Sequence, residues 1–431
     1  MNLSIATVIA SLLLPFITIA GETKCDSILP ENLDGSMAIY NFRDCSPMPV
    51  YPDSLKPVKV IYVARHGARF LSSRKKVCKI ERALLDARAA GNISDKGIEF
   101  LNYLETVESA NRNKWGELSP LGVAEERELA GEMVKIFPPL QKMPLKLEGK
   151  ATFVPRAVMT MYEFMHGLNL VNDNISSSTS QGHMYSRLLY FFSVDSAFAQ
   201  YRAEGNWVPV YDEYVTENVP SAPAAMLFKN HSELSDAHLK KLTMEMYEVM
   251  KGNRAASLPP PTTAMMGEED YRQCYLASNL QHYLRNNITP LSHIAAEAVT
   301  PLLQQIIADA ETPADGGDTS LFGYFGHAET LLPLLSLMKI PGCFALPLDY
   351  KDLADTWRIE DITPLAANLA IVILKSESGK EYASLRLNGR DINPLQLSDD
   401  TDLDPGFSYG TVIVPWSELR TFWQHQINSY K

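Results

Sequence analysis

The segment VKVIYVARHGARF, residues 58–70, decides how the chain is expected to fold. Residues 58–64 are a short, mostly apolar and β-branched run that follows Pro57 and ends in the charged turn RHGAR. Such a run, without regular polar alternation, is typical of a central parallel strand that is covered on both faces. Because open α/β sheets bind ligands beyond the carboxyl ends of their strands, we expect a binding site at this turn.

The elements predicted around this strand indicate the fold class. Helical patterns follow over 79–90 and 94–110, and Ser119 with Pro120 is typical of the start of another helix. Residues 145–168 predict strand, loop and helix, residues 320–338 predict strand, turn and helix, and 365–376 and 382–392 predict paired strands. From 171 to 309 the patterns are helical, and no strand is predicted.

We therefore predict an α/β fold: a Rossmann-like, mostly parallel sheet flanked by helices, with a predominantly helical cap domain inserted. The predicted core comprises residues 21–170 and 310–431, and the predicted cap comprises residues 171–309. A chain of 431 residues is long enough for these two lobes.

Composition limits the class of partner. The formal net charge is -12, and a nucleic-acid surface needs a broad basic face, so no nucleic-acid partner is expected. A small anionic ligand remains possible, because a pocket can be positive on an acidic protein.

The first twenty residues have the features of a secretory signal peptide. An apolar run over residues 5–19 ends at Ala20, with small residues at the positions that a signal peptidase reads. We expect cleavage after Ala20 and export, to the medium, a periplasm or a secretory lumen. The alternative is an uncleaved anchor, but the run is short for a bilayer span, so no stable membrane insertion is expected. Export permits disulfide bonds, and Cys25 with Cys45 is one possible pair among five cysteines.

No cofactor motif is present. There is no CxxC pair, no HExxH, no Walker A loop and no GxGxxG, so neither a metal nor a nucleotide cofactor is expected.

The residue types of the RHGAR turn suit chemistry on phosphate. Arg65 and Arg69 carry planar guanidinium groups that match phosphate oxygens. His66 is a competent nucleophile when it is neutral, and nearby guanidinium groups favour that form. Gly67 permits a tight turn or a close approach of the backbone. The alternative is an arginine-rich surface loop beside a core histidine.

Two segments together resemble a known family. ARHGARF (64–70) resembles the RHGxR signature of the histidine phosphatase superfamily, in its acid phosphatase and phytase branch, and GYFGHAETLLPLL (323–335) resembles the second half of that family's site. Most members of this branch have His-Asp there, and His-Ala-Glu is similar to the multiple inositol polyphosphate phosphatases. Residues 119–138, 364–374 and 414–419 resemble further segments of that branch. Leu71 stands where many members have proline, which predicts a changed loop path.

The resemblance implies a role for each site residue. His66 attacks phosphorus and becomes a phosphohistidine, while Arg65, Arg69 and His327 bind the phosphate oxygens. Glu329 protonates the leaving oxygen, the alternative being only a carboxylate in the first turn of a helix. Arg156 is expected to supply a third arginine, the alternative being a surface residue.

A basic run follows the turn at once. Its members are Arg74, Lys75, Lys76, Lys79 and Arg82. A solvated helix face is the ordinary explanation, and contact of the first four with distal phosphates is the functional one.

The expected activity is hydrolysis of inositol polyphosphates such as phytate, through a phosphohistidine. Two alternatives are a broad histidine acid phosphatase acting on sugar phosphates or bisphosphoglycerate, and an exported phosphoanion-binding protein without turnover.

Overall fold

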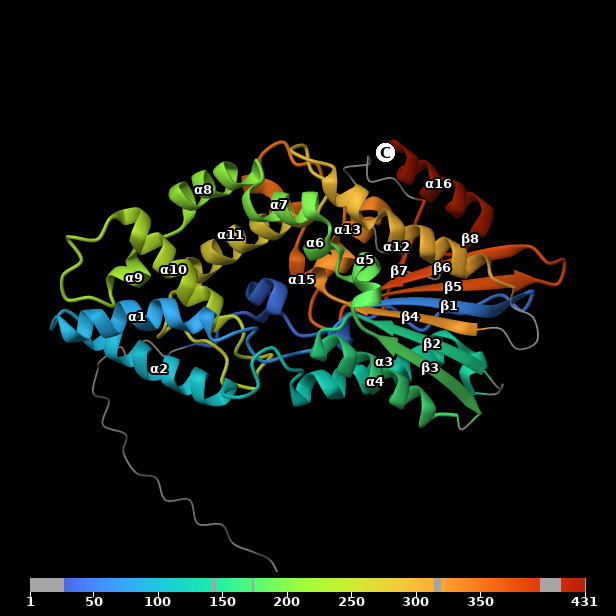
Figure 1. Cartoon of the computed structure of the whole chain (residues 1–431), viewed down its shortest axis with the longest axis horizontal. Helices are drawn as coiled ribbons and strands as arrows, with labels where there is room; N and C mark the ends of the chain where they lie inside the picture. Colours follow the sequence, from blue (N-terminus) through green and yellow to red (C-terminus); the bar gives the residue numbers. More distant parts are fainter. Residues whose placement is uncertain (1–26, 142–144, 173, 314–318, 396–411, 431) are drawn as a thin grey trace, which may run out of the picture.

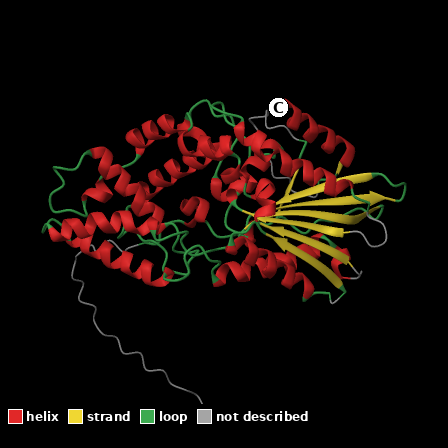
Figure 2. Ribbon diagram, in the orientation of Figure 1, coloured by secondary structure: helices red, strands yellow, loops and turns green. Residues whose placement is uncertain are grey.

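The structure is a computed structural model that describes residues 27–141, 145–172, 174–313, 319–395 and 412–430. One sheet lies at one end of the molecule, with helices on both of its faces. A second group of helices forms the opposite end of the molecule (Figures 1 and 2). The predicted signal peptide and Cys25 lie outside the described residues. Within those residues, no helix has both the length and the apolar character needed to cross a bilayer.

The sheet has eight strands in the order β3-β2-β4-β1-β5-β6-β7, with β8 paired to β6. The strands are β1 (Leu55–Arg65), β2 (Leu145–Ala151), β3 (Ile175–Gln181), β4 (Thr319–Gly326), β5 (Asn368–Ser376), β6 (Glu381–Leu387), β7 (Arg390–Ile392) and β8 (Val414–Pro415). β3, β2, β4 and β1 run parallel to one another, whereas β5 to β8 pair antiparallel. The predicted α/β class is confirmed, and the sheet is mixed, with its parallel half at the site.

The described residues form sixteen α-helices, most of which are labelled in Figure 1, and short 3-10 helices such as η1 (Glu31–Met37). The helices are α1 (Lys75–Ala89), α2 (Asp95–Asn111), α3 (Pro120–Ile136), α4 (Pro155–Asn169), α5 (Ser186–Leu189), α6 (Phe191–Val194), α7 (Ser196–Glu204), α8 (Trp207–Asn218), α9 (Ala222–Ala225), α10 (Asp236–Met250), α11 (Glu268–Asn286), α12 (Ile294–Glu311), α13 (Ala328–Leu337), α14 (Leu353–Thr356), α15 (Ile359–Ile362) and α16 (Trp416–Ser429). Ser119 caps α3 by accepting a hydrogen bond from the backbone N–H of Gly122, as its position predicts.

The predicted absence of a strand between 171 and 309 is wrong. β3 pairs parallel with β2 along its whole length and forms the edge of the sheet. Its sequence, ISSSTSQ, is almost entirely polar and partly exposed, so it has no hydrophobic periodicity that would reveal a strand. The helical lobe also includes α1 from outside the predicted insert, because α1 packs against α10.

Strand β1 separates two parts of the hydrophobic core, because successive side chains of a strand point to opposite faces. Val60 and Tyr62 pack with buried residues of α3 and α4 on one face. Ile61 and Val63 belong to the larger cluster on the other face, which continues through α12 and α13 into the helical lobe. The lobe is therefore joined to the sheet by a continuous apolar core.

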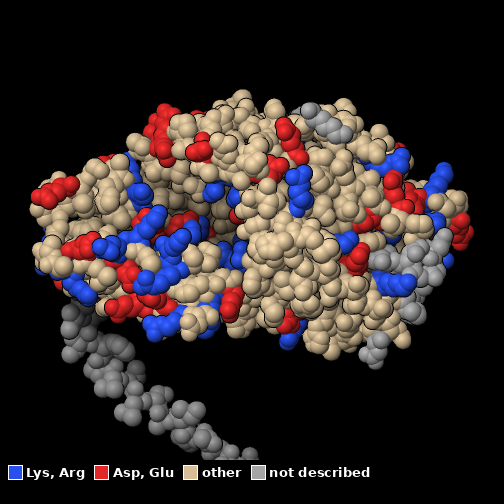
Figure 3. Space-filling view, in the orientation of Figure 1, with Lys and Arg blue, Asp and Glu red and all other residues tan. Residues whose placement is uncertain are grey.

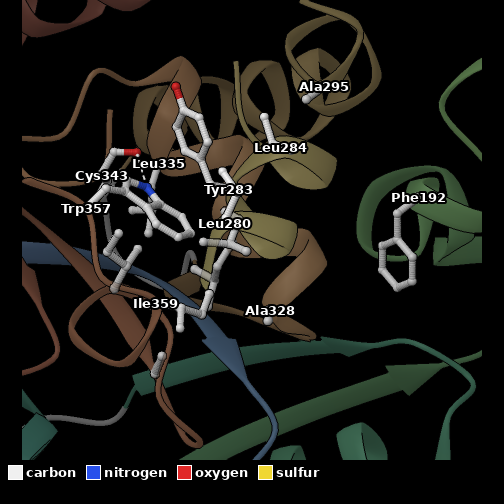
Figure 4. Packing of buried hydrophobic residues seen from close by; sticks show 14 of the residues in the cluster. Phe192, Leu280, Tyr283, Leu284, Ala295, Ala328, Leu335, Cys343, Trp357 and Ile359 are labelled. Atoms are coloured by element: carbon white, nitrogen blue, oxygen red, sulfur yellow. Dashed lines mark hydrogen bonds between the residues drawn. The ribbon is translucent and has the colours of Figure 1, made fainter. Parts of the chain in front are cut away.

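Helix α11 carries part of that junction. Its Leu280 and Tyr283 lie beside Trp357, whose indole N–H donates to the carbonyl of Cys343 at 3.3 Å (Figure 4). The rings of Tyr283 and Trp357 meet edge to face with centroids 5.4 Å apart. Among the described cysteines, Cys45, Cys78, Cys274 and Cys343 are free thiols.

Candidate active site

The register of two parallel strands brings the two sequence motifs together. Arg65 at the end of β1 is paired with Gly326 at the end of β4, and the backbone N–H of His66 donates to the Gly326 carbonyl at 3.1 Å. The residue after each strand is a histidine, His66 and His327, and their ring centroids are 5.6 Å apart. The early and late motifs therefore form one site at the carboxyl edge of the sheet.

Close packing of two glycines holds the RHGAR turn in place. A Cβ atom on Gly67 would lie 2.9 Å from the carbonyl oxygen of Gly122, and one on Gly122 would lie 2.2 Å from the carbonyl oxygen of Ala68. The N-terminus of α3 therefore packs directly on the turn. Thr160 of α4 fixes the turn from another side, because its hydroxyl accepts the N–H of Gly67 at 3.1 Å.

His66 is held as a neutral imidazole with one nitrogen engaged. Its Nδ1 lies 3.0 Å from the carbonyl oxygen of Gly67, which accepts the proton of that nitrogen and leaves Nε2 with a free lone pair. The residue is only 3% exposed. Burial is the largest cause that lowers its pKa well below 6.5, followed by the charges of Arg156, Arg65 and Arg69. A buried neutral imidazole of this kind is suited to act as a nucleophile.

Three arginines surround the histidine. In each of Arg65, Arg69 and Arg156, Nε is buried without a hydrogen-bond partner among the described residues. Burial is the main cause that lowers the pKa of Arg65 to about 10 and that of Arg69 to about 9. Three clustered guanidinium groups with unused donors form a site that favours a multiply charged anion.

His327 is positioned by a hydroxyl and an arginine. Its Nε2 lies 3.2 Å from Oγ1 of Thr152, and its Nδ1 lies 3.5 Å from Nη2 of Arg156. Because an arginine can only donate, we assign the proton of His327 to Nε2. Burial and then Arg156 lower the pKa of His327 to about 3. His327 is therefore a neutral hydrogen-bonding group, and its Nε2–H is the donor.

Glu329 lies in the first turn of α13 and pairs with an arginine of the helical lobe. Its Oε1 is 3.4 Å from Nη2 of Arg202 on α7. Burial acts to raise the pKa of Glu329, but neighbouring positive charge, chiefly that of Arg202, outweighs burial and holds the pKa of this carboxyl below its usual range. The ion pair thus favours the carboxylate form of Glu329.

Two buried carboxyl groups of α3 lie behind the turn. Glu125 accepts the backbone N–H of Ala68 at 2.7 Å and that of Tyr40 at 3.3 Å, and burial raises its pKa to about 7. Both carboxyl oxygens of Glu126 are buried without a partner among the described residues, and burial raises its pKa well above 4.5. An added Cβ on Gly67 would lie 3.1 Å from Oε1 of Glu126. The RHGAR turn therefore rests on a buried carboxyl group whose surroundings favour its protonated form.

The basic run after the turn lies at the start of α1, and most of it is paired. Arg74 binds Glu108 at 2.7 Å and Glu81 at 3.2 Å. Lys79 lies 3.7 Å from Glu245. The side chains of Arg74 and Lys79 are at least half exposed, so these pairs contribute little to stability. Arg82 binds Asp86 of its own helix.

Lys76 differs from the rest of the run because it shares an acidic partner with a buried lysine near Arg69. It binds Glu248 of α10 at 2.8 Å, and the same carboxylate binds the buried Lys251, whose ammonium also donates to Ser278. Burial is the largest cause that lowers the pKa of Lys251, and the nearby charge of Arg69 also lowers it. Figure 3 shows Lys and Arg side chains gathered around a hollow between α8 and α1. Lys75 is exposed.

Several site residues were missed by the sequence analysis. Glu125 and Glu126 belong to the helix that resembled the family, but acidic residues on an amphipathic helix usually face water. Arg202 and Lys251 lie in the helical lobe, where no motif marks them. Only the fold brings these residues beside the turn.

The chain is similar to known proteins in sequence pattern and in fold. The sequence model of the histidine phosphatase superfamily (branch 2) matches residues 58–388. The multiple inositol polyphosphate phosphatase of Bifidobacterium longum, in complex with inositol hexasulfate, has a TM-score of 0.72 and 17% identity, covering 84% of this chain and 92% of that one. The phytase from D. castellii has a TM-score of 0.68 and 16% identity, covering 92% and 85%.

At these identities, the two solved structures establish a shared fold. No curated protein matches this chain in sequence. The family model spans more than half of the chain and includes both His66 and His327. The chain therefore belongs to the histidine phosphatase superfamily (branch 2), and it is a phosphomonoesterase by membership.

Proposed function

We propose that this protein hydrolyses inositol polyphosphates of the phytate type through a phosphohistidine on His66. The observation that carries the proposal is the state of His66: it is buried and neutral, with Nδ1 bound to the Gly67 carbonyl and with no hydrogen-bond partner for Nε2 among the described residues. A neutral imidazole among cationic groups has both the lone pair and the electrostatic surroundings that attack on a phosphate ester requires.

The first step forms a bond from Nε2 of His66 to phosphorus and breaks the P–O bond to the alcohol. The electron pair of the broken bond goes to the ester oxygen, which takes a proton from Glu329. Arg65, Arg69 and Arg156 bind the other phosphate oxygens while charge is redistributed, and His327 supplies a hydrogen bond. In the second step water attacks phosphorus, the N–P bond breaks, and the carboxylate of Glu329 accepts the water proton.

The requirement for a protonated Glu329 is compatible with the ion pair that favours its carboxylate form. A phosphate dianion that binds the arginines offsets the positive charge that holds the carboxyl ionised, and its own charge favours protonation of Glu329. Substrate binding therefore promotes proton uptake, and the ion pair with Arg202 opposes it.

The preference for substrates with several phosphates is supported by charge beyond the reacting group. Lys76 and Lys251 flank Glu248 on the side of Arg69, and Arg74, Lys75 and Lys79 extend positive charge along α1. The Bifidobacterium longum enzyme, which shares the fold, was solved with inositol hexasulfate, an analogue with one anion on each ring position. We further propose that the protein acts after export, on the basis of the apolar residues 5–19.

The proposal is tested by release of inorganic phosphate from phytate in the presence of EDTA. Wild type is expected to release phosphate, and His66→Ala is expected to lose essentially all release. His425→Ala, which removes an exposed histidine of α16, serves as the matched control and should behave as wild type. Absence of release from phytate and from every simple phosphomonoester by wild type would leave a phosphoanion-binding protein. Release from sugar phosphates at a higher kcat/KM than from phytate would favour a broad acid phosphatase.

A further inference from the structure

Arg202 connects the helical lobe to the proposed proton donor. Its Nη2 is 3.4 Å from Oε1 of Glu329, its Nε donates to Oδ1 of Asn286 at 3.0 Å, and its Nη1 donates to the Phe192 carbonyl at 3.3 Å. The guanidinium also lies over the rings of Phe192 and Phe198, 5.1 and 6.0 Å from their centroids. The side chain is 12% exposed. Arg202 is thus fixed by the lobe, while Glu329, 31% exposed, remains accessible.

Glu329 is surrounded by positive or titratable groups from every element packed near it. Each of these groups either shifts the pKa of Glu329 or has its own pKa shifted by Glu329. They are Arg202 of α7, His282 and Arg285 of α11, His327 at the end of β4, Arg65 and Arg69 of the turn, and Arg156 of α4. Only Arg202 makes an ion pair with the Glu329 carboxylate among the described residues. The mechanism needs a carboxylic acid, yet this pair stabilises the carboxylate.

We propose that Arg202 is a positioning residue that makes protonation of Glu329 depend on a second phosphate of the substrate. A phosphate next to the one being cleaved competes with Glu329 for Nη2 of Arg202, while Nε and Nη1 keep their contacts with the lobe. The carboxyl then takes up a proton and can donate it to the leaving oxygen. A substrate with one phosphate leaves the ion pair in place and reacts slowly. The binding energy of the second phosphate is thereby used to protonate the group that donates to the leaving oxygen. This inference rests on the proposed function and adds a source of selectivity in kcat.

The inference predicts a difference in pH profile between two substrates of the wild type. The decline of kcat at high pH reports ionisation of the proton donor in the enzyme–substrate complex. This decline of kcat is expected at a higher pH for phytate than for an inositol monophosphate. In Arg202→Gln, the pH at which kcat for the monophosphate declines should rise by about one unit. At pH values above this decline, kcat of the variant should therefore be about tenfold higher than kcat of wild type. Most of the difference between the substrates should then be lost.

Two further variants separate charge from structural support. Arg202→Lys keeps the positive charge beside Glu329, so the decline of its kcat for the monophosphate should remain near the wild-type pH even if its melting temperature falls. Arg272→Gln removes an exposed charge of α11 that pairs with Glu268 and Glu269, and it should leave both profiles unchanged.

Three results would overturn the inference. The first is a decline of kcat for the monophosphate that does not move in Arg202→Gln, and the second is an equal shift in the Gln and Lys variants, which indicates a structural role. Either result, with phytate still hydrolysed by wild type, leaves the proposed function intact. The third is failure of wild type to release phosphate from either substrate, which refutes the proposed function and the inference with it.

Discussion

Replacement of Glu126 by glutamine is expected to stabilise the protein near neutral pH and to have little effect in acid. Glu126 is 0% exposed and has no hydrogen-bond partner among the described residues. Burial, and then the neighbouring Glu125, raise its pKa above the ordinary value of 4.5, which it regains on unfolding. Above pH 4.5 the folded protein therefore binds the proton more strongly than the unfolded chain does. Its free energy of unfolding falls as pH rises.

The size of this effect follows from proton linkage. The slope for one buried carboxyl is about 1.4 kcal/mol per pH unit between its pKa in the unfolded chain and its raised pKa in the folded protein. Wild type therefore loses stability through this residue as the pH rises above about 5. Glutamine has nearly the same shape and does not ionise, so the variant should retain that stability. At about pH 4 the carboxyl is protonated in both states, and the two proteins should differ little.

Urea unfolding at several pH values measures the difference. Glu128→Gln removes an exposed carboxylate of the same helix and is the matched control, expected to stay within a few tenths of a kcal/mol of wild type. The reasoning is refuted if the stability difference between Glu126→Gln and wild type is the same at acidic and neutral pH. A destabilised variant at neutral pH would also contradict it, because it would reveal an ionised and paired Glu126.

Three further changes test the site. Glu329→Gln should lower kcat for phytate by about 10²- to 10⁴-fold with a small change in KM, as expected on loss of a general acid; an unchanged kcat would place the acid elsewhere. Thr160→Val should lower the free energy of unfolding by about 1–3 kcal/mol, because it leaves the buried N–H of Gly67 without its hydrogen bond. Thr160→Ser keeps the hydroxyl and should retain most of the wild-type stability. If chemical denaturation shows that both variants lose the same stability, the hydrogen bond is not the cause. Lys76→Gln should raise KM for phytate more than KM for a monophosphate, and Lys75→Gln should do so less; equal effects on the two substrates would remove the distal-contact proposal.

The local features of the sheet and its turns are well predicted from sequence because they depend on neighbours in the chain. The apolar run before Arg65 forms β1, Ser119 caps α3, and the strand-turn-helix at His327 is present. That the two motifs form one site was expected only through resemblance to a family, and the pairing of β1 with β4 was not predicted, because register between distant strands is not encoded in either one alone. The polar edge strand β3 was missed for lack of periodicity.

The remaining features depend on contacts between distant elements. The sequence shows Arg74 and Lys76 as a basic run, but their partners Glu108 and Glu248 come from α2 and α10. Arg202 has no motif around it, and its position beside the proposed acid depends on how the helical lobe packs on α13. Such a contact changes the ionisation expected of Glu329, the predicted proton donor, because the ion pair with Arg202 favours its carboxylate form.

The most direct test of the account is to trap the covalent intermediate. Enzyme mixed with phosphate-labelled substrate is quenched in alkali, which preserves phosphohistidine, and the labelled peptide is sequenced and its isomer determined. The account predicts label on residues 58–70, at Nε2 of His66, because Nδ1 is bound to the Gly67 carbonyl. Label on another histidine or at Nδ1, or turnover without any labelled histidine, would contradict it.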